Sequence, residues 1–252
     1  MSKVPISYPY VDRQPIKITT ETQKLTGCTW LNTGRVWDLD ITQYFHDQCK
    51  KVESPIIFDV GAQTGSFTLI SKFLPKTAQM YGFEPLPASF KCLQDNLELN
   101  ELGSPRAQVY NCGLSNVVGE TVLKVPDHKG LCTMGENPLR FRDYESVNVQ
   151  TDTIDHFCEE NNVNGLDFMK IDTEGWEYFV LRGGVNTIKR YKPEILMEWN
   201  AQNMEQCGVN KDVFMRFITD ELGYTVQKQF RDDIYIVTGH SDSIGSVCSQ
   251  SS

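Results

Sequence analysis

The clearest indication of the fold is the sequence Ile56-Ile57-Phe58-Asp59-Val60-Gly61-Ala62-Gln63-Thr64-Gly65. It begins with a short, mainly apolar run, which is typical of a buried parallel strand. The run ends at glycines, which let the backbone turn tightly and approach a ligand closely. Residues 66–73 are then expected to form a helix that stops near Pro75. The stretch therefore predicts the first strand, turn and helix of an α/β domain.

Alternating strands and helices continue after this unit. We expect strands at 78–83, 108–111, 166–171 and 194–199, helices at 87–102, 153–161, 176–181 and 212–222, and a closing pair of strands at 224–226 and 234–237. Residues 114–150 interrupt the pattern with a hairpin near 117–121 and a polar loop at 126–145. The pattern predicts a Rossmann-like α/β fold with a mostly parallel, seven-stranded sheet and helices on both faces. Ligands of such sheets bind outside the carboxyl ends of the strands.

Three parts of the chain are expected. Residues 1–51 are an N-terminal extension, an extended arm followed by a short helix near 38–50 that Asp38 or Asp40 caps, and this extension is a candidate substrate cap. Residues 52–238 form the α/β domain. Residues 239–252 are a serine-rich tail that we expect to be disordered.

Composition argues against several classes of protein. The net charge of -9 argues against nucleic acid as a partner, because phosphate binding needs an excess of Lys and Arg. The 8 cysteines contain no C-x-x-C pair, which argues against a zinc knuckle. No apolar run approaches a membrane span, and the N-terminus has no apolar signal core. These features predict a cytoplasmic protein and leave its oligomeric state open.

The glycine turn has the spacing G-x-x-x-G, from Gly61 to Gly65. The dinucleotide fingerprint G-x-G-x-x-G needs a middle glycine so that a pyrophosphate can reach the helix N-terminus. S-adenosylmethionine (SAM) has no pyrophosphate, and its methionine part is a zwitterion. The carboxylate of Asp59 suits the ammonium group of that zwitterion. The turn alone is equally consistent with a plain connection between strand and helix.

A second carboxylate strengthens the interpretation. Glu84 follows the second expected strand, nineteen residues after Gly65. An acid at this position accepts hydrogen bonds from both ribose hydroxyls of a nucleoside. Turn, strand and spacing together favour a binding role for Glu84 over a solvated loop carboxylate.

A third group of polar residues lies at the ends of the fourth and fifth strands. Asp172 and Glu174 follow the fourth strand, and Glu198 ends the fifth. Lys170 lies within the fourth strand, where burial demands a partner. We expect that partner to be Glu194 or Glu198, either in a structural ion pair or in a functional role.

Several of these blocks together resemble the FkbM-type methyltransferases. The resemblance covers about 52–200, and its most specific blocks are Asp59-Val60-Gly61-Ala62-Gln63-Thr64-Gly65 and Lys170-Ile171-Asp172-Thr173-Glu174-Gly175. It implies a class I SAM-dependent fold and, usually, O-methylation of a hydroxyl on a sugar, polyketide or glycan-like molecule. One departure is Gln63, where the family most often has Asn.

The expected cofactor-binding residues follow the first four strands. They are Asp59, Gly61, Ala62, Gln63, Thr64, Gly65, Glu84, Pro85, Cys112, Gly113 and Asp172. The expected catalytic residues are Asp172, Glu174 and Glu198, one of which would accept the proton of a hydroxyl. His128, in the polar loop, is a weaker candidate for that base.

Four hypotheses about the function of the protein stay open at this point. The first is a metal-free O-methyltransferase that acts on a sugar, a glycan or another small molecule. The second is a catechol-type enzyme in which Asp172, Glu198 and Asn200 hold Mg²⁺. The third is a SAM-binding partner subunit without catalysis. The fourth is an RNA 2′-O-methyltransferase, which the net charge disfavours.

Overall fold

A seven-stranded sheet forms the centre of the computed structural model, which describes residues 6–9, 11–25, 39–135, 143–231 and 233–238. The strand order is β11-β12-β10-β9-β3-β4-β5. The strand β12 runs antiparallel to both of its neighbours, and the other pairs are parallel. The predicted fold class, a class I Rossmann-like domain with a mostly parallel seven-stranded sheet, is confirmed.

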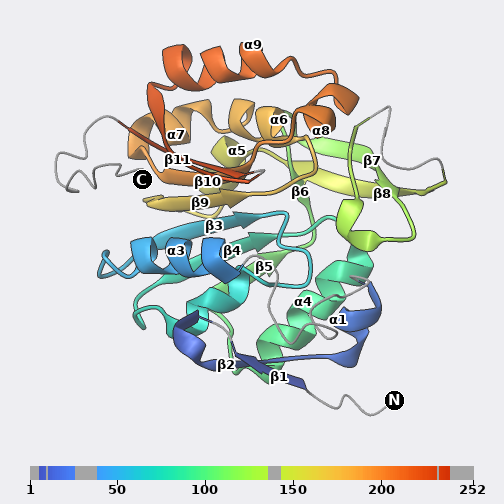
Figure 1. Cartoon of the computed structure of the whole chain (residues 1–252), viewed down its shortest axis with the longest axis vertical. Helices are drawn as coiled ribbons and strands as arrows, with labels where there is room; N and C mark the ends of the chain where they lie inside the picture. The colour runs from blue at the N-terminus through green and yellow to red at the C-terminus, as the bar shows by residue number, and fades with distance from the viewer. Residues whose placement is uncertain (1–5, 10, 26–38, 136–142, 232, 239–252) are drawn as a thin grey trace, which may run out of the picture.

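The elements of this domain follow the expected alternation (Figure 1). The strands of the main sheet are β3 (Ile56–Val60), β4 (Gln79–Phe83), β5 (Ala107–Tyr110), β9 (Phe168–Ile171), β10 (Glu194–Glu198), β11 (Tyr224–Phe230) and β12 (Asp233–Thr238). The α-helices around it are α3 (Leu39–Cys49), α4 (Pro87–Leu99), α5 (Ile154–Glu160), α6 (Glu177–Arg182), α7 (Val185–Tyr191), α8 (Ala201–Gln206) and α9 (Lys211–Arg216).

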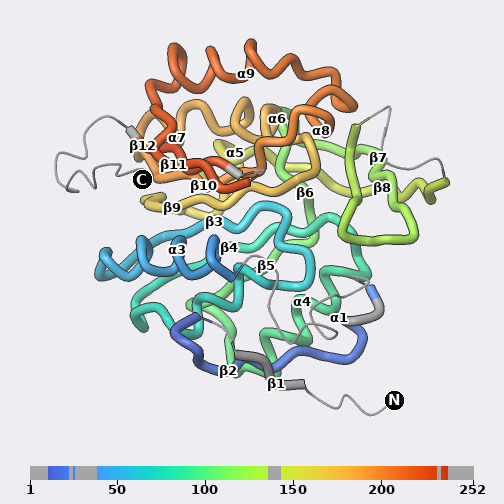
Figure 2. Tube along the Cα trace, viewed as in Figure 1, coloured from blue at the N-terminus to red at the C-terminus, as the bar shows by residue number. Residues whose placement is uncertain are grey.

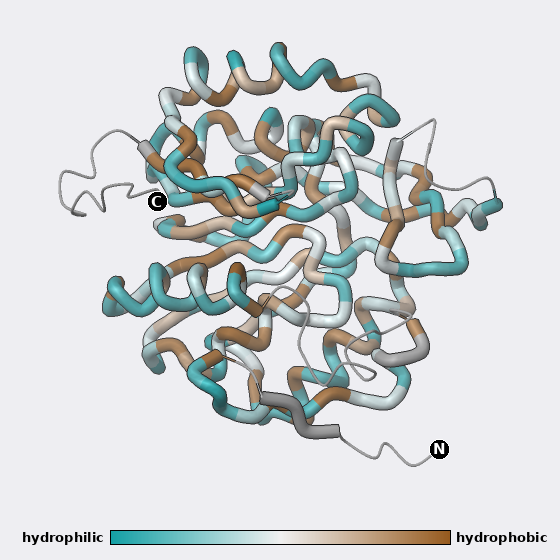
Figure 3. The backbone as a smooth tube through the Cα atoms, viewed as in Figure 1, coloured by the Kyte–Doolittle hydropathy of each residue, from teal (hydrophilic) through white to brown (hydrophobic). Residues whose placement is uncertain are grey.

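Both faces of the sheet are buried. Neighbouring residues of each strand point to opposite faces, so each strand contributes to two cores. Ile57, Phe168 and Leu196 join a core with residues of α3 and α4. Phe58 and Met169 join a second core with residues of α5, α6, α7 and α9. The helix α9 carries both hydrophilic and hydrophobic residues (Figure 3), and its buried residue Phe214 belongs to this second core. The helices therefore cover both faces of the sheet, as predicted.

A small second sheet, in the order β6-β8-β7, stands beside the main one (Figure 2). Its strands are β6 (Gly113–Leu114), β7 (Gly119–Val125) and β8 (Glu145–Asp152). A hairpin was expected near 117–121, but β7 begins there and pairs with β8 across a long connection. Leu123, Val125 and Val149 form a core with Met134 and Leu86, and this burial favours the long-range pairing.

The N-terminal residues depart most from the predicted extended arm. The strands β1 (Ile6–Pro9) and β2 (Pro15–Ile18) form an antiparallel pair. The 3₁₀ turn η1 (Val11–Arg13) joins them, and the helix α1 (Thr20–Leu25) follows. The amide groups of Asn96 and Asn100, both from the α4 segment, bond the backbone of Thr19 and Lys17. These contacts satisfy backbone groups that an isolated arm would leave to water.

Other differences are local. The helix expected at 66–73 is the 3₁₀ helix η2 (Thr68–Phe73), and the helix expected at 212–222 continues from α9 into the π-helical turn η4 (Phe217–Glu221). The helices α7 and α8 were not predicted. The Asp38 cap, the tail and residues 136–142 of the polar loop lie outside the described residues. Among the residues described, no helix combines the length and the apolar character needed to cross a membrane.

Candidate functional site

The candidate site lies at the carboxyl end of β3, where the sheet order reverses between β4 and β9. The turn after β3 is fixed by the amides of Gly61 and Ala62, which both donate to the carbonyl of Phe83 at 3.0 and 2.9 Å. Gly61 has a φ of +76°, and a Cβ added to it would lie 1.9 Å from the carbonyl oxygen of Asp172. Only glycine allows the turn after β3 to lie so close to the end of β9.

A cavity of about 480 Å³ opens between these strand ends. Seven of the predicted site residues line it, namely Gly61, Gln63, Glu84, Pro85, Gly113, Asp172 and Glu174. The other predicted residues do not line it; they are Asp59, Ala62, Thr64, Gly65, Cys112 and Glu198. The volume falls within the usual range for cofactor and small-molecule sites.

Asp59 and Lys170 form a buried ion pair beneath the cavity. The ammonium of Lys170 lies 3.5 Å from Asp59 and 3.6 Å from Asp172, and it donates to the carbonyl of Gly61 at 3.1 Å. The other carboxylate oxygen of Asp59 accepts from the hydroxyl of Thr68 at 2.6 Å. Lys170 thus ties the glycine turn to the end of β9.

The prediction that Glu194 or Glu198 pairs with Lys170 was wrong. Lys170 is the register partner of Asp59 on β3 and of Leu196 on β10, so Asp59 lies directly beside it on the same face of the sheet. Glu194 and Glu198 share that face, but each is two residues away from Leu196 along β10. Glu194 accepts from the hydroxyl of Tyr235 instead, and Glu198 accepts from the amide of Asn203. The ion-pair partners of Lys170 are Asp59 of β3 and Asp172, which follows the end of β9.

Glu84 lies in the wall of the cavity and is 7% exposed. One carboxylate oxygen accepts from the amide of Gln63 and the other from the amide of Leu86, both at 2.8 Å. Burial raises the pKa of Glu84 to about 7, although these backbone donors act in the opposite direction. The side chain is held rigidly and faces a ligand-sized space.

Asp172, Glu174 and Glu198 converge beside this wall, as the sequence predicted. One oxygen of each lies within 4.8 Å of the others, so the three can hold a cation. The amide of Asn203 donates to Glu174 at 2.8 Å and to Glu198 at 3.0 and 3.2 Å. Burial, together with the charges of Asp172, Glu174 and Glu177, raises the pKa of Glu198 to about 11. Asp172 is the exposed member of the group, with 46% of its side chain accessible.

Asn200 does not belong to this group in the way the Mg²⁺ hypothesis requires. Its side-chain oxygen accepts from the backbone amides of Gln202 and Asn203 at 3.0 and 3.2 Å, which caps the start of α8. A preference for Asn at helix starts was a signal for this role in the sequence. Asn203, fully buried on the unpredicted α8, is the amide that contacts the carboxylates.

The remaining walls of the cavity come mainly from the polar loop, where the sequence indicated only His128, a weaker candidate base, and from α3. From the polar loop come His128 and the 3₁₀ turn η3 (Lys129–Leu131), and from α3 comes Ile41. A Cβ on Gly130 would lie 3.0 Å from the side-chain amide of Gln63, so this loop packs directly on the glycine turn. Apolar side chains line the same space: Phe67, Leu114, Leu123, Cys132, Met134, Trp176 and Leu196.

These features fit an adenosine-containing cofactor with a zwitterionic tail. Glu84 presents carboxylate oxygens that can accept hydrogen bonds from ribose hydroxyls. Apolar residues such as Met134 and Trp176 offer surface for a base, and the turn from Gly61 to Gln63 leaves room beside the backbone. Lys170 and Asp172 supply charges of both signs next to that turn.

Known proteins match more than half of the chain. It is 29% identical over 162 residues to Methyltransferase 1 of Beauveria bassiana (strain ARSEF 2860), a match that covers 56% of this chain and 64% of that protein. It is 28% identical over 163 residues to 2-O-methyltransferase NoeI of Sinorhizobium fredii (strain NBRC 101917 / NGR234), which covers 60% of this chain and 65% of that protein. The matches thus span slightly less than two thirds of these relatives.

The fold is similar to that of a Staphylococcus aureus protein suggested to be a caffeoyl-CoA O-methyltransferase. The TM-score is 0.53 at 9% identity, and the match covers 88% of this chain and 93% of the other. At this identity the likeness shows the fold alone. The model of the methyltransferase FkbM domain matches residues 59–226, which is more than half of the chain and includes every predicted site residue. The chain therefore belongs to the methyltransferase FkbM domain family, with S-adenosylmethionine as its cofactor.

Proposed function

We propose that this protein transfers a methyl group from SAM to a hydroxyl of a sugar, glycan or other small molecule. The observation that carries the proposal is the exposed carboxylate of Asp172, which lines the cavity 3.6 Å from Lys170 and beside the glycine turn. The relative described as a 2-O-methyltransferase supports oxygen as the acceptor atom. The family membership supports the reaction class.

Bound SAM supplies the methyl group on an activated sulfonium centre. What the protein adds is orientation of the acceptor and removal of its proton. In our proposal, Asp172 accepts the hydroxyl proton on its side-chain carboxylate, while the nearby ammonium of Lys170 fixes the position of that carboxylate. Glu84 binds the ribose, and the loop that carries His128 and η3 excludes water above the glycine turn.

Asp172 is a better base than the other two candidates. A pKa raised to about 11 leaves Glu198 protonated at neutral pH, where it cannot accept a proton. Glu174 is held by Asn203, whose amide donates to it at 2.8 Å. We assign Glu174 and Glu198 to positioning Asp172 and the acceptor.

A metal-assisted version of the same reaction is the second candidate. The convergence of Asp172, Glu174 and Glu198 within 4.8 Å favours it, because carboxylate oxygens suit Mg²⁺. In that case the cation would neutralise the group and bind the acceptor oxygen. A chelator separates the two versions, since only the metal-assisted enzyme would lose activity and regain it with Mg²⁺.

The test uses labelled SAM with a panel of sugars, glycans, lipids, peptides and RNA, followed by Asp172→Asn on the best acceptor. We expect Asp172→Asn to retain cofactor binding and to lose about 10²–10⁴-fold in turnover, the usual contribution of a general base. Glu198→Gln imitates the protonated acid and should lose much less. Glu205→Gln, at an exposed position on α8, is the matched control for a lost carboxylate.

Asp172→Asn with wild-type turnover would refute the role of Asp172. Absence of turnover on every acceptor class, with intact cofactor binding, would instead favour a SAM-binding partner subunit.

A cytoplasmic location is also part of the proposal. The cysteines at 49, 92, 112, 132, 158 and 207 are all unpaired, as in a reducing compartment.

A further inference from the structure

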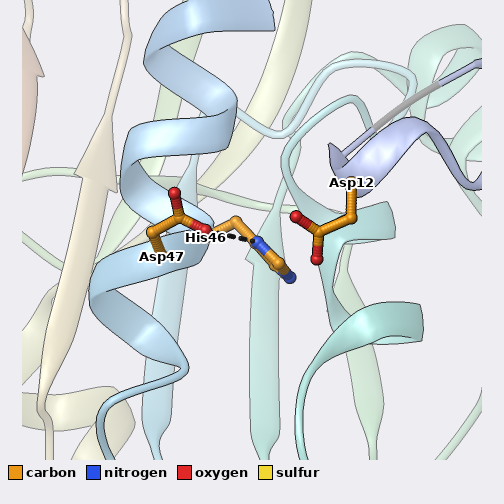
Figure 4. Close-up of side chains that lie close together, drawn as sticks. All are labelled: Asp12, His46 and Asp47. Atoms are coloured by element: carbon orange, nitrogen blue, oxygen red, sulfur yellow. Dashed lines mark hydrogen bonds and ion pairs between the residues drawn. The ribbon is translucent and has the colours of Figure 1, made fainter.

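A second group of candidate metal ligands lies outside the cavity, where α3 meets the η1 turn. Figure 4 shows the imidazole of His46 between the carboxylates of Asp47, its neighbour on α3, and Asp12 of η1. One ligand atom of each residue lies within 4.8 Å of the others. His46 is fully buried, whereas about half of each aspartate side chain is exposed.

The spacing of these atoms suits a small cation. The Nδ1 of His46 lies 3.3 Å from a carboxylate oxygen of Asp47. Zinc binds nitrogen and carboxylate oxygen at about 2.0–2.2 Å, so tetrahedral neighbours lie about 3.3 Å apart. Asp12 is exposed and can rotate to complete the group.

The side chain of Gln43 marks the point that the three ligands surround. Its amide nitrogen lies 3.0 Å from Asp12, 3.0 Å from Asp47 and 3.4 Å from Nδ1 of His46. Gln43, His46 and Asp47 are neighbours on one face of α3, three and four residues apart. A positively polarised NH₂ group therefore occupies the position where these acceptors converge.

The imidazole of His46 and the carboxylates of Asp12 and Asp47 are the groups that a cation would use here. Lys50 lies 3.1 Å from the second oxygen of Asp12, so a bound cation would share that carboxylate with an ammonium group. The Nε2 of His46 is buried without a hydrogen-bond partner. That cost exists with or without a bound metal, so it does not oppose binding at Nδ1.

We propose that Asp12, His46 and Asp47 form a binding site for a divalent transition cation, zinc above all, that ties the N-terminal η1 turn to α3. Mixed nitrogen and oxygen ligands favour zinc over Mg²⁺ or Ca²⁺, which prefer oxygen alone. The site is independent of the proposed methyl transfer. A bound cation would hold the η1 turn against α3 and so stabilise the N-terminal part of the molecule. The same helix carries Ile41 into the cavity wall.

The experiment is calorimetric titration of the chelator-treated full-length protein with zinc, paired with thermal denaturation. Asp172→Asn serves as the parent, so that the carboxylates at the cavity do not contribute a second site. We expect micromolar binding at a stoichiometry of one and a rise in melting temperature with zinc. Asp47→Asn, at a half-exposed position that keeps the fold, should weaken binding by at least about tenfold.

Two further variants test the geometry. Gln43→Ala and Lys50→Met remove the groups that compete with the cation, so each should strengthen zinc binding. Asp220→Asn, at an exposed position beside α9, is the matched control and should leave binding unchanged. Failure of the parent to bind zinc, or equal affinity in Asp47→Asn and the control, would overturn the proposal.

Discussion

Glu84 carries a carboxylate in a place where burial opposes its charge. In the protein without cofactor, burial raises its pKa to about 7, so the charged and neutral forms coexist at neutral pH. Between the ordinary value of 4.5 and about 7, the folded protein therefore binds more protons than the unfolded chain does. It follows that Glu84 lowers the free energy of unfolding as the pH rises through this range. Ribose hydroxyls would donate to the ionised form and offset the cost.

We predict that affinity for S-adenosylhomocysteine depends on pH through Glu84. Because the ionised carboxylate is the form that accepts both ribose hydroxyls, affinity should be highest above pH 7. Below it, affinity should fall by up to about tenfold per pH unit. Calorimetric titrations from pH 5.5 to 8.5 measure this.

Glu84→Gln provides the contrast, because an amide cannot ionise. It should weaken binding at pH 8 by about 1–3 kcal/mol and flatten the pH profile. A wild-type profile that is flat over this range, or an unchanged one in Glu84→Gln, would show that Glu84 does not bind the ribose.

The positions of single residues at the site were predictable where strand geometry dictates them. Glu84 and Asp172 were identified because parallel strands deliver their last residues to one edge of the sheet. The partner of Lys170 was not, because the choice between Asp59 and the glutamates depends on the register of neighbouring strands, which places Asp59 directly beside Lys170. Asn203 was missed together with its helix, and no pattern of charge in the sequence reveals its contacts with Glu174 and Glu198.

Among the elements, the glycine turn after β3 is the one on which the site depends most. We predict that Gly61→Ala destabilises the protein and displaces Asp172, because its Cβ would lie 1.9 Å from the Asp172 carbonyl at a φ of +76°. The strained backbone alone costs about 1–3 kcal/mol, and each kcal/mol lowers the melting temperature by roughly 2–4 °C in a domain of this size. Cofactor affinity should fall as well.

Gly103→Ala is the matched control for this prediction. A Cβ at Gly103 would meet no atom within 4 Å. Thermal denaturation and S-adenosylhomocysteine titration of both variants decide the matter. Equal melting temperatures in the two variants would contradict the close approach of the turn to β9.

The strands of the main sheet were the most predictable elements, and the elements that depend on tertiary contacts were the least. All strands of this sheet were expected, and short apolar runs bounded by turns mark most of them. The helix α8 has six residues and α7 follows a glycine pair that ends the preceding helix, so neither has enough periodicity to be recognised. The pairing of β7 with β8 spans a loop, and it depends on a core that includes Leu86 from another part of the chain.

At the scale of the molecule, the N-terminal residues are part of one packed core. Val11, Ile16 and Ile18 are fully buried in the cluster that also contains Ile57 of β3 and Phe168 of β9. Composition concealed this, because residues 1–25 are rich in Thr, Pro, Lys and Gln and show little periodicity. The packing implies that the start of the chain contributes to stability and does not merely flank the domain.

We therefore predict that Ile16→Ala destabilises the whole molecule. The change removes a fully buried side chain from the core shared with the central sheet, for which losses of about 2–5 kcal/mol are typical. Lys17→Ala, on the exposed side of the same strand, is the matched control, because the hydrogen bonds of Lys17 with Asn100 use its backbone and survive the change. Chemical denaturation followed by far-UV circular dichroism should show one cooperative transition that shifts to lower denaturant in Ile16→Ala alone. If the N-terminal segment were an independent arm, the two variants would unfold at the same midpoint as the wild type. A shared core predicts instead that a loss at Ile16 weakens β3 and β9, and with them the strand ends that hold Asp59 and Asp172.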